Sequence, residues 1–150
     1  MKHILEATPG LLDLLPIAAE VCGRKGDSPR VVPLFGDGSD RKFFRIFCGA
    51  RSLIALVSPR KNINSLDEND SYLLIGKHLQ RRKIPVPSIL YADSRSGRFL
   101  LEDAGDRHLQ KFARTRTNGL QQIYGRTAKL LAALHRDAPE GFIPDFCFDG

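Results

Sequence analysis

The chain has 150 residues, and 23 Lys and Arg against 17 Asp and Glu give it a formal net charge of +6. Its hydrophobic share of 42% and charged share of 27% are ordinary for a globular protein, which excludes disorder throughout the chain. No apolar run approaches the roughly 20 residues that span a bilayer, and the N-terminus lacks the apolar segment of a secretory signal. We therefore expect a soluble cytoplasmic protein, either one domain or one lobe of a larger one.

The first part of the chain predicts a helix followed by three strands. Residues 3–23 carry the wide apolar stripe of an amphipathic helix, which Pro16 would bend or restart. A polar turn at 23–29 follows. Strands are then expected at 31–35, 42–47 and 52–57, separated by turns at 36–40 and 49–51. Short connections between consecutive strands predict an antiparallel meander.

The rest of the chain predicts a helix, a hairpin and a last helix. A polar loop at 62–70 precedes a helix at 71–82, and strands at 88–92 and 98–102 flank a hairpin turn at 93–97. Gly105 and Asp106 break the pattern before an amphipathic helix at 120–135. The residues expected to face inward on this helix are Ile123, Tyr124, Ala128, Leu130, Leu131 and Leu134. The order predicts an α+β fold with helices packed on one five-stranded antiparallel sheet.

Cysteines, histidines and basic residues exclude several other classes. Cys22, Cys48 and Cys147 form no CxxC pair, so we expect reduced thiols that are mostly small buried hydrophobes. The four histidines lack metal-ligand spacing, so no metal site is predicted. The basic residues are spread along the chain and do not alternate with aromatic residues, which disfavours a nucleic-acid-binding domain.

The turn from Gly36 to Asp40 is the segment most informative about chemistry. Its glycines let the backbone approach a ligand closely, and successive N–H groups can donate to phosphate oxygens. A plain hairpin turn with glycines at positive φ explains the same residues. A dinucleotide fingerprint is disfavoured because a strand, not a helix, follows the glycines, and a Walker loop is excluded because no Gly-Lys-Ser/Thr is present.

Four blocks of sequence resemble the N-terminal part of the aminoglycoside phosphotransferase/choline kinase family, most closely its bacterial sugar-kinase-like members. The blocks are Gly38-Ser39-Asp40-Arg41-Lys42-Phe43-Phe44-Arg45, 84–93, 99–106 and 130–135. The resemblance implies a protein-kinase-like small lobe at 30–104, preceded by a helical segment at 1–29. It also implies that residues 105–150 are linker helices at the start of a C-terminal lobe that the chain lacks.

The resemblance implies roles for individual residues. The loop over the ATP phosphates would comprise Gly36, Asp37, Gly38, Ser39, Asp40 and Arg41. The hinge that binds adenine through its backbone would comprise Leu101, Glu102, Asp103 and Ala104, with the Glu102 and Asp103 side chains expected as solvated charges. Glu68 or Asp70 would be the acid at the start of the helix after strand three. In such kinases that acid holds a lysine of strand three, which contacts the α- and β-phosphates.

Strand three departs from this pattern because residues 53–57 contain no lysine. The cations that could replace it are Arg51, Arg60, Lys61, Lys42 and Arg45. Arg60 and Lys61 are more simply explained as exposed loop charges. The sequence leaves the choice among these cations open.

His135-Arg136-Asp137 spells the start of a protein-kinase catalytic loop, but the position that needs a metal-binding Asn is Phe142. We therefore interpret His135 as a packing or C-terminal helix residue and Asp137 as a turn residue. No general base and no complete magnesium site is predicted, so the catalytic set is empty.

The resulting expectation is the ATP-binding lobe of a phosphotransferase that moves the γ-phosphate to a hydroxyl of a small molecule, such as a sugar, an amino sugar or an aminoglycoside-like compound. ATP and Mg²⁺ are the implied cofactors, and this fragment alone is not expected to catalyse transfer. The alternative is a non-catalytic kinase-like module that binds a nucleotide or a partner. The expected partners are a nucleotide and a small-molecule acceptor, not nucleic acid or membrane. An apolar face at the hinge and the last helix is expected to cause self-association.

Overall fold

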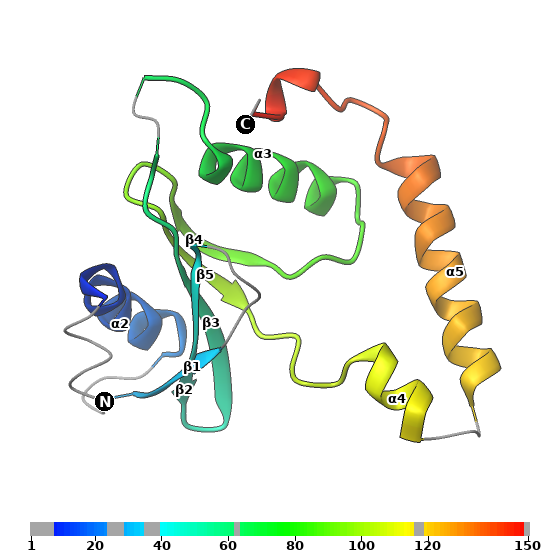
Figure 1. The fold of residues 1–150 in the computed structure, drawn as a ribbon, viewed down its shortest axis with the longest axis horizontal. Coiled ribbons are helices and arrows are strands. Elements are labelled where there is room, and N and C mark those ends of the chain that lie inside the picture. The colour runs from blue at the N-terminus through cyan, green and yellow to red at the C-terminus, as the bar shows by residue number, and fades with distance from the viewer. Residues whose placement is uncertain (1–7, 24–28, 35–39, 62–63, 116–118, 149–150) are drawn as a thin grey trace.

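The computed structural model describes residues 8–23, 29–34, 40–61, 64–115 and 119–148 (Figure 1). The helices are α2 (Pro9–Val21), α3 (Glu68–Arg81), α4 (Leu109–Thr115) and α5 (Leu120–Asp137), with a 3-10 turn, η1, at Pro144–Phe146. The strands are β1 (Arg30–Leu34), β2 (Lys42–Cys48), β3 (Arg51–Val57), β4 (Ile89–Asp93) and β5 (Arg98–Glu102). The predicted α+β class with a five-stranded antiparallel sheet is confirmed.

The strand order across the sheet is β1-β2-β3-β5-β4, so β3 is the central strand. Figure 1 shows α2 on one face of the sheet and α3 on the other. Alternate residues of each strand point to opposite faces. Leu53, Ala55 and Val57 of β3 therefore join the core under α2, whereas Leu56 joins the core under α3.

Helix α2 packs on the sheet through Leu11, Leu14 and Ala18, which have no exposed surface. Their spacing of three and four residues places them on one side of the helix. Pro16 was expected to bend or restart this helix; it does not restart it, because one helix runs from Pro9 to Val21 with Pro16 inside it. The apolar contacts of α2 with the sheet offset the hydrogen bond that Pro16 cannot donate.

Helix α3 begins at Glu68, three residues before the predicted start at Ser71. Asp67 and Asp70 form a capping box, in which the Asp67 side chain accepts from the backbone of the first turn and Asp70 accepts from the Asp67 N–H at 3.1 Å. The acidic residues that looked like part of a polar loop are therefore the cap and first turn of the helix. As a result, Glu68 and Asp70 lie on the helix itself.

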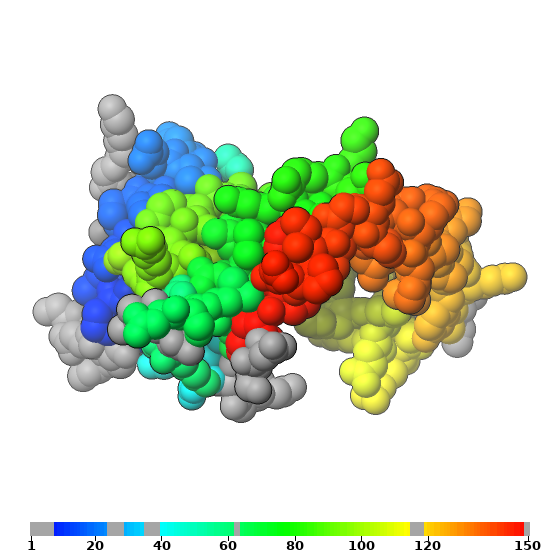
Figure 2. Space-filling view, turned by 90° about the horizontal axis from the view of Figure 1, so that it is seen from above, coloured from blue at the N-terminus to red at the C-terminus, as the bar shows by residue number. Residues whose placement is uncertain are grey.

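The segment after α5 returns along α3 (Figures 1 and 2). The buried His78 ring donates from Nε2 to the Ala138 carbonyl at 2.7 Å, and its ring centroid lies 5.6 Å from that of Phe142. At the other end of the helix, the Phe148 N–H donates to the Ser71 hydroxyl at 2.8 Å. These contacts hold the C-terminal segment against the side of α3.

Helices α4 and α5 stand apart from the sheet (Figure 1). The sequence predicted linker helices after the hinge but assigned no range to α4. It also predicted that six apolar residues of the last helix face inward, and this is wrong, because α5 has no buried residue. Tyr124, Leu130 and Leu131 are about half exposed, at 52%, 46% and 53%. The described helices all fall short of the length and apolarity that crossing a membrane requires.

The three cysteines are thiols, as predicted, but only Cys48 is buried. Cys22 is half-buried and Cys147 is exposed. The expectation that they are mostly buried is therefore wrong.

Gly97 closes the β4–β5 hairpin against the end of β3. Its φ is +68°, its carbonyl accepts from the Ser58 N–H at 2.8 Å, and a Cβ on it would lie 1.7 Å from the Ser58 carbonyl oxygen. The Asn69 side chain of α3 donates to the same Ser58 oxygen at 2.9 Å. The hairpin, β3 and α3 thus meet at a point with no room for a side chain.

We expect Gly97→Ala to lower the free energy of unfolding by more than the roughly 1–3 kcal/mol that backbone strain alone costs, because the methyl group would displace the Ser58 backbone. Gly23→Ala is the matched control, since Gly23 has a φ of +69° and no described neighbour within 4 Å of an added Cβ. Urea unfolding of the two variants measures the difference. Equal stability losses would show that the contact with Ser58 contributes nothing.

Candidate functional site

The predicted phosphate loop lies mostly outside the described residues. Gly36, Asp37, Gly38 and Ser39 fall in the undescribed range 35–39, and only Asp40 and Arg41 are described. These two residues immediately precede β2 and therefore show where the loop ends.

Two ion pairs join the end of this loop to the region around the start of α3. Arg41 Nη2 lies 2.9 Å from Glu68 Oε1, and the Arg41 guanidinium lies 5.5 Å from the centroid of the Tyr72 ring. Lys61 Nζ lies 2.9 Å from Asp40 Oδ2, and both of these side chains are about three-quarters exposed. Three predicted site residues, Asp40, Arg41 and Glu68, are thus brought together.

Arg41 occupies a more protected position than Lys61. Its side chain is 16% exposed, and Tyr72 and Glu68 of α3 lie beside it. It is therefore held on the sheet face that α3 covers. Arg41 was predicted in the loop, but its pairing with Glu68 was not predicted.

Arg60 was expected to be an exposed loop charge, and this is wrong. Its side chain is 13% exposed, Nη2 lies 2.7 Å from Asp70 Oδ2, and it also donates to the Ser65 carbonyl at 2.8 Å. Lys61, at 73% exposed, is the surface charge that was predicted. The hydrogen bond from Arg60 is the main reason that the pKa of Asp70 is lowered to about 2. Burial acts in the opposite direction, and hydrogen bonds from Ser94 and the Asp67 N–H add to the lowering.

At Leu56, the α3-facing side of β3 has no room for the missing lysine. Leu56 is 0% exposed there and packs in the core with Phe99 and Tyr72. Lys42 is exposed and pairs in register with Val57, which belongs to the core under α2. Lys42 is thus on the opposite face, and Arg51 lies at the far end of β3. Arg41 pairs with Glu68 of α3, and Arg60, one of the candidate cations, pairs with Asp70.

Asp103, one of the residues predicted to form the hinge, belongs to a second cluster, around Arg45 of β2. Arg45 Nε lies 2.7 Å from Asp103 Oδ2, and Arg45 Nη2 donates to Asp103 Oδ1 at 3.1 Å. Asp103 Oδ2 also accepts from the Ser52 hydroxyl at 2.6 Å. Arg45 Nη1 donates to Asp106, whose side chain is 77% exposed, at 2.7 Å.

Asp103 was expected to be a solvated charge, and the structure contradicts this. Its side chain is 6% exposed. Burial acts to raise the pKa of Asp103, but the hydrogen bonds from Ser52, the Gly105 N–H and Arg45 outweigh burial and lower it. A carboxylate with such partners stays ionised inside the protein. Arg45 was predicted only as a candidate phosphate-binding cation, and its pairing with Asp103 was not predicted.

Glu102 behaves as predicted and is exposed at the end of β5. It accepts hydrogen bonds from the N–H and the hydroxyl of Ser88 at 3.1 and 2.8 Å. Of the remaining hinge residues, Leu101 is buried in the sheet and Ala104 is exposed.

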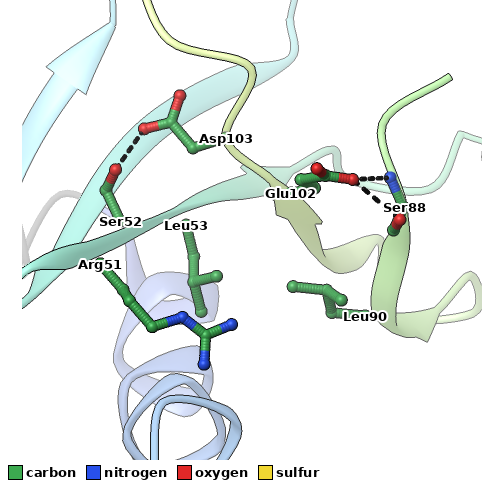
Figure 3. Close-up of a pocket in the computed structure, with 7 residues that line it drawn as sticks. All are labelled: Arg51, Ser52, Leu53, Ser88, Leu90, Glu102 and Asp103. Carbon is green, nitrogen blue, oxygen red and sulfur yellow. Dashed lines mark hydrogen bonds between the residues drawn. The ribbon is translucent and has the colours of Figure 1, made fainter. Parts of the chain in front are cut away.

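A cavity of about 390 Å³ lies beside the predicted hinge (Figure 3). The residues that line it are Arg51, Ser52, Leu53, Ser88, Leu90, Glu102 and Asp103. Figure 3 shows Arg51 and Leu53 pointing toward helix α2, while the Ser52–Asp103 hydrogen bond lies on the other side of the sheet. The cavity is thus on the α2 side, behind the face that carries Arg45 and Arg41.

His135 and Asp137 take no part in either cluster. His135 is exposed in the last turn of α5, so it is a C-terminal helix residue but not a packing residue. Asp137 ends α5 and pairs with Arg136 at 2.6 Å, so it is not in a turn. Within the described ranges, no group of three or more His, Cys, Asp or Glu side chains could hold a metal ion.

Comparison with known proteins adds no assignment, because no family model matches the chain and no curated protein matches it.

The Arg60–Asp70 pair should affect how the free energy of unfolding changes at acidic pH. A carboxylate whose folded pKa is below its unfolded value of about 3.9 stabilises the fold above that value, and this stabilisation is lost as pH falls toward the folded pKa of about 2. We therefore expect the free energy of unfolding to drop between about pH 4 and pH 2 less steeply in Asp70→Asn than in the wild type. Urea unfolding across this range measures the slope. Asp145→Asn, which alters an exposed carboxylate in η1, should keep the wild-type slope, and an unchanged slope in Asp70→Asn would contradict the assignment.

Proposed function

We propose that this chain contains the nucleotide-binding lobe of an ATP-dependent phosphotransferase, which moves the γ-phosphate to a hydroxyl of a small molecule such as a sugar, an amino sugar or an aminoglycoside-like compound. The order of elements supports the proposal. A glycine-rich segment connects β1 to β2, helix α3 connects β3 to β4, and an extended linker leaves β5 toward two further helices. This is the arrangement that the resemblance to the aminoglycoside phosphotransferase/choline kinase family implies.

The observation that carries the proposal is the ion pair between Arg41 and Glu68. In protein kinases, the cation paired with the acid of the helix after strand three contacts the α- and β-phosphates. Here the acid is in the expected place, at the first residue of α3, and the cation comes from the end of the glycine-rich loop. A guanidinium presents planar paired donors, which suit phosphate oxygens.

Two cations of the described residues lie where the phosphates of ATP would bind. Arg41 and the exposed Lys61 lie where the glycine-rich segment meets α3 and would hold the phosphates of the nucleotide. The nucleotide supplies the phosphoryl group, and the lobe contributes its positioning and charge stabilisation. Mg²⁺, which the resemblance also implies, has no ligand set among the residues that the structure describes.

The first test is nucleotide binding by the full-length protein, with MgATP, Mg-tripolyphosphate and adenosine as titrants in calorimetry. We expect Arg41→Met to weaken ATP and tripolyphosphate by roughly 10- to 100-fold, the value of a charge-assisted hydrogen bond, and to leave adenosine unchanged. Arg51→Met, which removes an exposed cation from the other end of β3, should bind all three as the wild type does. Wild-type protein that binds no nucleotide would refute the proposal. A protein that binds ATP but transfers no phosphate to any acceptor would support the alternative, a non-catalytic kinase-like module.

The exposed apolar side chains of α5 generate a separate expectation. We propose self-association through Tyr124, Leu130 and Leu131, because half-exposed large apolar side chains on one helix favour burial against a second surface. Light scattering at micromolar concentrations should show a mass above the monomer, and Leu130→Glu/Leu131→Glu should restore the monomer. A wild-type monomer at all concentrations would contradict this.

A further inference from the structure

We infer that Arg45, Ser52 and Asp103 form a latch that holds the hinge against the sheet and so positions its backbone for the nucleobase. Because this inference concerns the base end of the nucleotide, it rests on the proposed function. Arg41, which belongs to the other cluster, would bind the phosphate end of the nucleotide.

The latch spans three strands. In register, Arg45 of β2 lies opposite Ile54 of β3, and Ile54 lies opposite Leu101 of β5. Asp103 follows Leu101 by two residues, just beyond the end of β5. To reach Asp103, the Arg45 side chain therefore extends over β3, on the face of the sheet that α3 also packs against.

The carboxylate of Asp103 is held in one orientation. Oδ1 accepts from Arg45 Nη2 at 3.1 Å and from the Gly105 N–H at 2.8 Å. Oδ2 accepts from the Ser52 hydroxyl at 2.6 Å and lies 2.7 Å from Arg45 Nε. Oδ1 thus accepts two hydrogen bonds and Oδ2 accepts one beside its ion pair with Arg45, and these partners come from β2, from β3 and from the linker itself. Side-chain exposures of 12% for Arg45 and 6% for Asp103 place these contacts largely out of water, where they are strong.

The latch acts on the segment where the resemblance places base recognition. The backbone of this segment, residues 101–104, leaves the sheet where β5 ends at Glu102. None of the described strand pairings holds it beyond that residue. The Asp103 contacts fix the next residue. Arg45 also holds Asp106 at 2.7 Å, so the same guanidinium restrains the start of the linker toward α4. A backbone held in this way can present its N–H and C=O groups to a base without first becoming ordered.

Arg45 would act on the base end of the nucleotide, and Arg41 would act on its phosphate end. They lie four residues apart, at and just before β2, which separates them by roughly 13 Å along an extended chain. Glu68 and Tyr72 of α3 lie beside Arg41, and the hinge lies beside Arg45. Loss of the latch should therefore affect the base and spare the phosphates.

The test uses the full-length protein and two ligands, MgATP and Mg-tripolyphosphate, in calorimetric titrations. The main variant is Arg45→Met/Asp103→Asn, which removes both charges together and so leaves no unpaired buried charge. We expect its ATP affinity to fall about tenfold or more while its tripolyphosphate affinity stays within about twofold of wild type. Ser52→Ala, which removes one donor to Asp103, should show a smaller loss of the same kind. Arg30→Met is the control, since it removes a cation stacked on Phe47 of β2 without touching the hinge.

The outcomes separate the two proposals. Wild-type protein that binds neither ligand refutes the proposed function. Wild-type protein that binds both, with a double variant that binds both equally well, refutes the latch alone. An equal fall in affinity for both ligands also refutes it, because general loosening of the lobe would affect the phosphates too. Should the double variant lose its cooperative thermal transition, Ser52→Ala decides: an ATP-specific loss supports the latch, and unchanged ATP affinity refutes it.

Discussion

The burial of β3 on both faces is the constraint on which the rest of the structure depends. Leu53, Ala55 and Val57 are enclosed under α2, and Leu56 is enclosed under α3. A charged side chain at these positions would lose its hydration and gain no partner in exchange, which costs free energy. The central strand therefore carries only packing residues over this stretch, and the charged groups are displaced to its two ends and to the neighbouring strand.

Two charge clusters follow from this displacement, one just before β2 and one around the middle of β2. Arg41 meets Glu68 where the chain enters β2, and Arg45 reaches across β3 to Asp103. Both pairs lie on the α3 side of the sheet. The Arg41 pair links the sheet to helix α3, and the Arg45 pair links it to the linker after β5. One face of the sheet thus carries the candidate phosphate end and the candidate base end of a single nucleotide site.

Most of the sheet could be predicted because its signals are local. Strand β5 was predicted with the observed bounds, and β2, β3 and β4 within one residue at each end, because alternating apolar residues between glycine-containing turns leave few other registers. The start of α3 was missed because acidic residues favour loops and helix caps alike, and only the Asp67–Asp70 capping box distinguishes them. The inward face of α5 was predicted from its periodicity, but periodicity does not say whether a surface is there to cover it.

Local pattern alone was enough to settle the α+β class, the antiparallel strands and the absence of a lysine from β3, because each depends on residues close together in the sequence. The partners of the charged residues were decided by the tertiary structure. Arg45 and Asp103 are 58 positions apart, and their pairing depends on β3 lying between β2 and β5. A side chain's exposure and its ion-pair partner are properties of the packed sheet, and for that reason Asp103 and Arg60 appeared to be surface charges in the sequence but are partly or fully enclosed in the fold.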